Sequence, residues 1–106
     1  MAKTVQLRAL ADADIDAALA WYTAEAPHAA ARFLQMLEST IKRIGASPNL
    51  GSALYAVELQ MPGLRHRKLP KFPYLVFYFE NEAAIDIVRV LHAHRDLPSD
   101  LAASDP

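Results

Sequence analysis

The chain has 106 residues, a length that suits one domain built around a single core. Its 53% hydrophobic and 22% charged residues are typical of a globular protein, and no stretch reaches the roughly 18 apolar residues of a transmembrane helix. The absence of cysteine excludes disulfides and thiolate metal sites. Because residues 1–10 lack a long apolar run, we expect no signal peptide. Together with the lack of a transmembrane stretch and of cysteine, this favours a cytoplasmic location without membrane association.

Charge is unevenly distributed along the chain. The net charge is −1 and the sequence pI about 6.4, so general attraction to nucleic acid is not implied. Residues 64–79 nevertheless contain no acid and four basic residues, Arg65, Arg67, Lys68 and Lys71. This segment is either a solvated strand and turn, or a docking surface for an acidic partner or a phosphate backbone.

The first part of the chain predicts a strand followed by a helix. Residues 5–10 alternate between apolar and polar side chains, as a short strand does. Asp12 is expected to be the N-cap of the helix, and Trp21 is expected to help bury the edge of its apolar stripe. That stripe recurs at helical spacing and comprises Ile15, Ala18, Leu19, Tyr22 and Ala26.

Pro27 is expected to begin a second helix, because proline is tolerated in a first helical turn. Gly45 at the C′ position and Pro48 beyond it mark the expected end. The tight junction between the two helices predicts an antiparallel hairpin. The apolar stripe of the second helix comprises Ala30, Phe33, Leu34, Leu37, Ile41 and Ile44.

The remaining sequence predicts strands. Residues 49–56 are expected to form a loop that leads into a short strand. Residues 64–69 alternate, with Arg65 and Arg67 on one face and His66 and Lys68 on the other. Residues 72–79 are almost continuously apolar, as in a central strand, and residues 84–91 should pair with them as a hairpin.

The predicted order is β-α-α-β-β-β, an α+β fold in which the helical hairpin packs on one face of a mostly antiparallel sheet. We expect a single domain over residues 1–106, with residues 97–106 as a polar tail, and an open second sheet face. The residues expected in or near the core are Ile15, Leu19, Tyr22, Phe33, Leu37, Ile41, Val76 and Ile87.

Few residue sets in the chain could carry out a reaction. The serines lie in no nucleophile elbow, and three glycines provide no phosphate loop. His92 and His94 share a strand face but lack further ligands at metal-binding spacing, so we expect no metal and no cofactor. His92 could transfer a proton or could be a structural histidine at a strand end. A phosphate could be stabilised by Arg65, Arg67, Lys68, Lys71, Arg89 and Arg95.

Four segments carry motifs that occur together in one known family. Residues 7–22 combine a short strand with an acid-rich helix start, and residues 26–51 contain a helix with a Phe-Leu pair and a Pro-x-x-Gly exit. Residues 62–79 contain an arginine-bearing strand and the core strand Tyr-Leu-Val-Phe-Tyr, and residues 85–97 contain Arg-Val-Leu-His followed by Arg-Asp. In this order the segments resemble the RelE/ParE superfamily of toxins, and the ending resembles its ParE-like branch.

The resemblance implies the RelE/ParE fold and a type II toxin–antitoxin system, in which an adjacent gene encodes the antitoxin. The antitoxin segment should be hydrophobic and partly acidic, and should lie between the helical hairpin and the sheet or add to a sheet edge. ParE-like toxins trap DNA gyrase by binding, whereas RelE-like toxins cut mRNA in the ribosome. The chain has the ParE-like ending and no late tyrosine, and its low net charge disfavours rRNA, so DNA gyrase is the expected target.

Two alternatives remain open. One is a metal-independent, ribosome-dependent mRNA endoribonuclease whose catalytic residues are Arg65, Lys68, Arg89 and His92. The other is a degenerate, non-toxic member of the family. Under the binding interpretation, target or antitoxin would be contacted by Arg65, Arg67, Lys68, Lys71, Arg89, His92 and Arg95.

Overall fold

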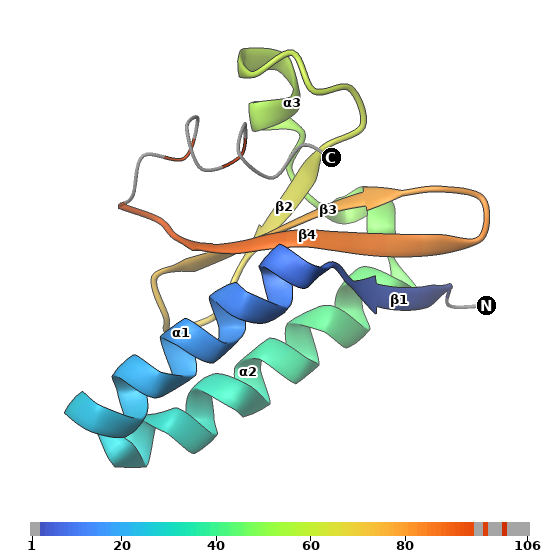
Figure 1. Ribbon diagram of the computed structural model, residues 1–106. Coiled ribbons are helices and arrows are strands. Elements are labelled where there is room, and N and C mark those ends of the chain that lie inside the picture. The colour runs from blue at the N-terminus through green and yellow to red at the C-terminus, as the bar shows by residue number, and fades with distance from the viewer. Residues whose placement is uncertain (1–2, 95–96, 98–100, 102–106) are drawn as a thin grey trace.

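A computed structural model describes residues 3–94, together with residues 97 and 101 (Figure 1). Helices α1 and α2 form a hairpin that covers one face of a four-stranded sheet, and the short helix α3 lies on the other side (Figure 1). The elements are β1 (Thr4–Leu7), α1 (Ala9–Glu25), α2 (Pro27–Ala46), the 3-10 turn η1 (Pro48–Leu50), α3 (Leu54–Glu58), β2 (Arg65–Lys68), β3 (Tyr74–Glu80) and β4 (Ala84–His92).

The sheet has the strand order β1-β4-β3-β2. Strand β1 runs parallel to β4, whereas β4 with β3 and β3 with β2 are antiparallel pairs. The register between β3 and β4 shifts between Phe77 and Tyr78. The predicted α+β fold and its mostly antiparallel sheet are therefore confirmed. None of the described helices is long and apolar enough to cross a membrane.

The main core lies between the helical hairpin and the sheet. Tyr22 of α1 stacks on Phe33 of α2 with ring centroids 5.2 Å apart, and both rings contact Phe72. Leu37 is 3% exposed, and Val76 and Ile87 are fully buried against the same cluster. Burying an apolar side chain of this size contributes about 1.5–3 kcal/mol to the stability of the fold. The apolar stripes of α1 and α2 therefore hold the helical hairpin against the sheet, as predicted.

The other face of the sheet is not open, which corrects the prediction. A second cluster buries Leu64, Leu75, Phe77 and Leu91, with Tyr55 and Leu59 from α3 packed against it. Leu97 and Leu101 are 4% and 0% exposed in this cluster, so the expected polar tail supplies two core side chains. The rest of residues 97–106 lies outside the described residues.

Several local predictions are wrong for identifiable reasons. Strand β1 ends at Leu7, and Arg8 rather than Asp12 is the N-cap of α1, with no side-chain cap. Gly45 lies inside α2, where a Cβ atom would come within 3.1 Å of Val5 Cγ2. Glycine is therefore used there for the close approach of β1 and not for ending the helix. Trp21 is 58% exposed and does not cover the edge of the stripe.

Candidate functional site

The basic residues of β2 are divided between the two faces of the sheet. Arg65 and Arg67 pair with Tyr78 and Val76, which belong to the core beneath the helical hairpin. His66 and Lys68 pair with Phe77 and Leu75 of the second core. Because paired residues in antiparallel strands share a face, the predicted alternation along this strand is correct.

Arg65 and Arg67 lie beside a hydrogen-bonded junction between η1 and the sheet. Arg65 Nη1 donates to the carbonyl oxygen of Gly51 at 2.7 Å, and the Tyr78 hydroxyl donates to the carbonyl oxygen of Pro48 at 2.5 Å. Burial, and to a lesser degree the negative charge of Glu80, raises the pKa of the Tyr78 hydroxyl, while a hydrogen bond with the Gly51 backbone and the positive charges of Arg65 and Arg67 oppose that increase. The Arg65 guanidinium is thus held at one edge of the sheet, and Arg67 belongs to the same face of the same edge strand. Lys68 and Lys71 are exposed.

Arg89 is buried in an ion pair and is not displayed with the basic residues of β2. Its Nε and Nη2 atoms donate to Asp14 Oδ2 and Oδ1 at 2.7 and 2.9 Å. The Arg89 and Asp14 side chains are only 9% and 12% exposed. The sequence did not reveal Asp14 as the partner of Arg89, because an acid near a helix start already has a local explanation.

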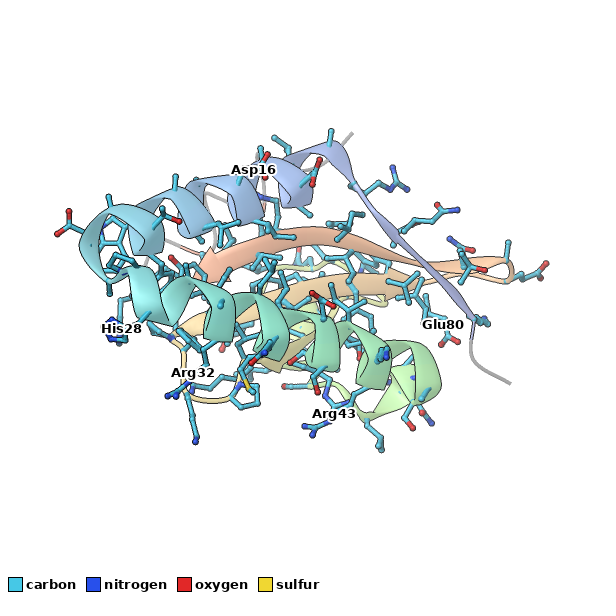
Figure 2. All side chains as sticks on the ribbon, turned by 90° about the horizontal axis from the view of Figure 1, so that it is seen from below. Asp16, His28, Arg32, Arg43 and Glu80 are labelled. Carbon is cyan, nitrogen blue, oxygen red and sulfur yellow. The ribbon has the colours of Figure 1, made fainter. Side chains whose placement is uncertain are left out.

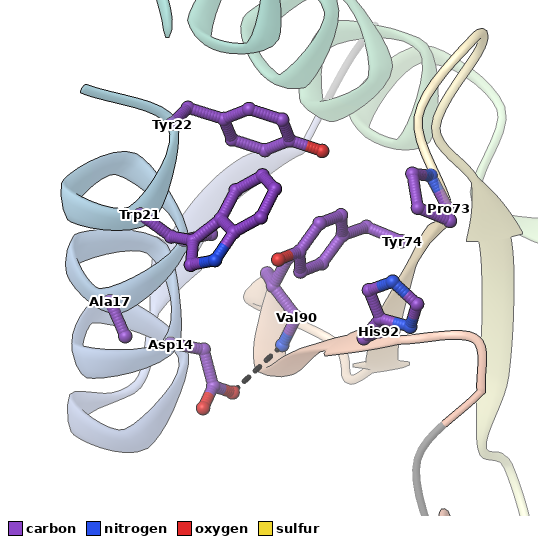
Figure 3. A pocket seen from close by; sticks show the side chains of 9 residues that line it. Asp14, Ala17, Trp21, Tyr22, Pro73, Tyr74, Val90 and His92 are labelled. Carbon is purple, nitrogen blue, oxygen red and sulfur yellow. Dashed lines mark hydrogen bonds between the residues drawn. The ribbon is translucent and has the colours of Figure 1, made fainter. Parts of the chain in front are cut away.

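A pocket of about 520 Å³ opens between α1 and the adjacent ends of β3 and β4 (Figure 3). Trp21 and Tyr22 form its helical wall, while Tyr74 and His92 face them from the sheet (Figure 3). The His92 ring lies 5.3 Å from the rings of both Tyr74 and His94, and His92 Nδ1 accepts the His94 backbone N–H at 3.2 Å. The complete lining is Asp14, Ala17, Ala18, Trp21, Tyr22, Pro73, Tyr74, Val90 and His92.

Comparison with known proteins identifies the family. A family model described as "ParE toxin of type II toxin-antitoxin system, parDE" matches residues 5–97. The chain belongs to the ParE toxin family. A solved structure described as "Chromosomal ParDE TA system from P. aeruginosa" contains a similar chain, with a TM-score of 0.71 and 22% sequence identity. The similarity covers 87% of this chain and 97% of the other and supports the fold. No curated protein sequence matches the chain.

In this ParE-family toxin, the residues considered for an endoribonuclease do not converge. His92 is paired with Tyr74 in β3, whereas Arg65 is paired with Tyr78 on the far side of that strand. The Cα atoms of His92 and Arg65 are therefore two interstrand spacings and four residues along the strand apart, which corresponds to a distance on the order of 15 Å. Lys68 belongs to the opposite face, and Arg89 is engaged by Asp14.

Two further observations complete the description of the site. In the described part of the chain, no three His, Asp or Glu residues are close enough together to hold a metal ion. Arg95, which was predicted to contact a target or an antitoxin, lies outside the described residues. Sequence reasoning also missed Trp21 as a pocket residue, because its position one residue from an apolar stripe suggested burial instead.

Proposed function

We propose that this chain is the toxin of a type II toxin–antitoxin pair, that an antitoxin encoded by an adjacent gene neutralises it, and that its target is DNA gyrase. Membership in the ParE toxin family supports the first part of the proposal. The target is inferred from the chemistry available on the molecule, because a toxin that acts by binding needs a complementary surface and no proton-transfer group of its own.

The observation that carries the choice of target is the separation of Arg65, Arg89 and His92. Cleavage of RNA without a metal needs cations and an acid–base group around one phosphate. Arg89 is 9% exposed and bonded to Asp14 through two nitrogen atoms, so its charge is already compensated. His92 lies across β3 from the arginines of β2. This arrangement favours a toxin that acts by binding.

The antitoxin has two surfaces available to it. Arg65 and Arg67 at the edge of the sheet would attract the acidic part of an antitoxin segment. The pocket between α1 and the sheet would accept an apolar part. A segment that is disordered when free and folds on binding can cover both surfaces, which suits a toxin of this size.

A ribosome-dependent mRNA endoribonuclease is the second candidate. The observation in its favour is the position of His92, which is half-buried at a pocket with Tyr74 beside it. Histidine is the most frequent general acid or base in enzymes. Under this alternative, the cations would have to be supplied by residues other than Arg65 and Arg89, or by the ribosome.

Induction of the toxin in bacterial cells distinguishes these functions. Chromosomal breaks, plasmid supercoiling and mRNA integrity should be followed over the same period, with co-expression of the adjacent gene as the matched control. We expect DNA breaks and altered supercoiling while mRNA stays intact, and suppression of both effects by the antitoxin. Cleavage of ribosome-bound mRNA before any DNA damage would reject gyrase, and the absence of toxicity would indicate a degenerate member.

A further inference from the structure

Helix α2 presents two arginines on one side of the helical hairpin. Arg32 and Arg43 are exposed and lie about three helical turns apart, so they share one side of the helix and are separated by about 16 Å along its axis. Figure 2 shows both side chains pointing away from α1. Glu38, the one acid in the α2 sequence, is rotated by at least about 120° from both arginines and is one turn from Lys42.

One end of the edge strand β2 is fixed beside Arg32. The turn that follows β2 contains Lys71 and Phe72, and the Phe72 ring packs edge-on against the Phe33 ring with centroids 5.5 Å apart. Phe33 is the immediate neighbour of Arg32 in α2, and Lys71 is exposed next to Phe72. The contact between the rings therefore brings the charge of Lys71 to the end of α2 that carries Arg32.

The other end of β2 is fixed beside Arg43. Arg43 lies in the last turn of α2, and η1 follows directly. The Arg65 guanidinium donates to the carbonyl oxygen of Gly51, just after η1, at 2.7 Å, so the start of β2 is tied to the exit of α2. Arg67 lies farther along β2 and belongs, like Arg65, to the sheet face that the helical hairpin covers.

These side chains form one positively charged surface, termed the α2–β2 basic surface. Within the described part of the chain, none of its residues takes part in an ion pair. Figure 2 shows Asp16 of α1 on the opposite side of the hairpin from Arg32 and Arg43. The charge is therefore separated between two sides of the molecule, although the net charge is only −1. The α2–β2 basic surface consists of Arg32, Arg43, Arg65, Arg67 and Lys71.

The composition of this surface favours a nucleic acid over a protein as its partner. Among the described residues, the exposed large apolar side chains lie on β1, α1, η1 and α3, and none lies on α2 or β2. Protein interfaces have an apolar, often aromatic centre, whereas interfaces with DNA are more polar and much more positively charged. All cations of the surface except Lys71 are arginines, whose planar groups bind phosphate oxygens through paired hydrogen bonds.

We propose that the α2–β2 basic surface binds the phosphate backbone of duplex DNA, with α2 lying along one strand. The separation of Arg32 and Arg43 matches about five phosphates, at about 3.4 Å per nucleotide along the duplex axis. Backbone contacts carry no sequence information, so the binding is independent of sequence. The choice of DNA as the source of the phosphates rests on the proposed function, because a toxin bound to DNA gyrase lies close to duplex DNA.

Binding of the purified toxin to a fluorescently labelled duplex of about 20 base pairs, or two helical turns, tests the proposal. Anisotropy is measured over a range of salt concentrations. We expect saturable binding that weakens as salt rises, with a slope of log K against log salt of about −4, as for the release of counterions from four or five phosphates. Absence of binding at about 50 mM salt overturns the proposal. Tighter binding of an RNA duplex of the same sequence, or displacement of the DNA by an equally charged acidic peptide at the same concentration, also overturns it.

Variants locate the contact on the molecule. Arg32→Gln combined with Arg43→Gln removes two charges from the surface and should weaken binding at low salt by at least about tenfold and flatten the salt slope by about 2. Lys3→Gln combined with Lys68→Gln is the matched control and removes the same charge. Lys3 pairs with Glu80 beside the opposite edge strand, and Lys68 belongs to the other sheet face. Equal losses in the two double variants would show that only the overall charge matters and would reject the surface.

Crosslinking places the surface in the complex with the target. The chain contains no cysteine, so a single introduced cysteine can carry a photo-crosslinker. Ser39→Cys places it between Arg32 and Arg43 on the same side of α2, and Ala20→Cys places it on the exposed side of α1 as the control. In a mixture of toxin, gyrase and DNA, we expect Ser39→Cys alone to crosslink to DNA. No crosslink from Ser39→Cys, or an equal yield from Ala20→Cys, contradicts the inference.

The same measurements separate this inference from the choice of target. A toxin that binds the free duplex through the α2–β2 basic surface but does not inhibit supercoiling by gyrase would refute the target and leave the DNA contact in place. A toxin that inhibits supercoiling without binding or crosslinking to DNA would retain the target and overturn the DNA contact.

Discussion

Arg89 of β4 binds Asp14 of α1 through two hydrogen bonds, and the same Asp14 carboxylate accepts the backbone N–H of Val90. One side chain therefore compensates a buried charge and closes the edge of a strand. It also fixes the position of α1 over β4, and with it the wall of the pocket that contains Trp21.

Asp14→Ala should destabilise the fold strongly. The substitution leaves the Arg89 charge without its carboxylate and removes the acceptor of the Val90 N–H, and breaking a buried pair in this way costs about 3–5 kcal/mol. Urea unfolding measures the difference. Asp16→Ala is the control, because Asp16 is exposed on the same helix and should change the free energy of unfolding by less than about 0.5 kcal/mol. Similar values for the two variants would contradict a structural role of the pair.

Gly51 should tolerate no side chain as long as Tyr78 occupies its present position. A Cβ atom at Gly51 would overlap the Tyr78 hydroxyl and lie 2.9 Å from Tyr78 Cζ. Overpacking of this kind costs about 1–3 kcal/mol, so Gly51→Ala should lower the free energy of unfolding by at least that amount. Tyr78→Phe removes the hydroxyl but keeps Cζ, so in a double-mutant cycle it should recover part of the loss. Strictly additive effects would mean that the two residues do not meet.

His66 should make the protein less stable in mild acid. Its ring lies between Tyr55 and Phe77, and its buried Nδ1 has no hydrogen-bond partner among the described residues. Burial lowers the pKa of His66 below the usual 6.5. Between the two pKa values the unfolded chain binds more protons, so the stability falls as pH drops below about 6.5 and levels off once the folded protein is also protonated.

The measurement is the free energy of unfolding at about pH 7.5 and about pH 5.5, on either side of the ordinary histidine pKa. His66→Phe should reduce the loss between these conditions, because it removes the group whose proton affinity differs between the folded and unfolded states. His28→Phe is the matched control, since His28 is exposed on α2. A pH dependence that is unchanged in His66→Phe would show that other groups are responsible.

The predictable parts of this fold are those with a long local pattern. The stripes of α1 and α2 and the apolar run of β3 each repeat often enough to fix an element and its buried face. Helix α3 has only five residues, which is too short for the helical spacing of apolar residues to be recognised. Because this helix was not predicted, the second face of the sheet was expected to be open.

The features of the site that were missed depend on residues distant in sequence. Asp14 and Arg89 are separated by 75 positions, and each has an ordinary local explanation, as a helix-start acid and as part of a basic group. Gly45 likewise has a local explanation as a helix end, but its actual contact is Val5. Local sequence patterns could therefore indicate the candidate residues, but they could not indicate which of these residues contact one another in the fold.

Charge reversal on β2 should identify the face that meets the target. Arg67 and Lys68 are adjacent in sequence but belong to opposite faces. If the target contacts the side on which Arg65 and Arg67 lie, Arg67→Glu should weaken gyrase inhibition by about tenfold or more at low salt, while Lys68→Glu should have a much smaller effect. Arg65 is less suitable for this test, because its guanidinium also supports Gly51.

His92→Ala separates inhibition by binding from catalysis. Tyr74 and His94 contact the imidazole, so circular dichroism and thermal unfolding must first establish that the variant folds. If the toxin binds gyrase, removal of the imidazole acts only through local packing, and inhibition of supercoiling in a purified assay should change by no more than a few fold. If the toxin is a ribosome-dependent endoribonuclease that uses His92 as its acid or base, mRNA cleavage should fall by about 10²–10⁴-fold.

Both reactions should be measured with the same preparations of wild-type and His92→Ala toxin, because the pair of results distinguishes binding from catalysis. Cleavage of mRNA by the wild type that is lost in His92→Ala would reject gyrase binding as the mechanism. Undiminished supercoiling inhibition by the variant would leave His92 as a structural residue at the end of β4.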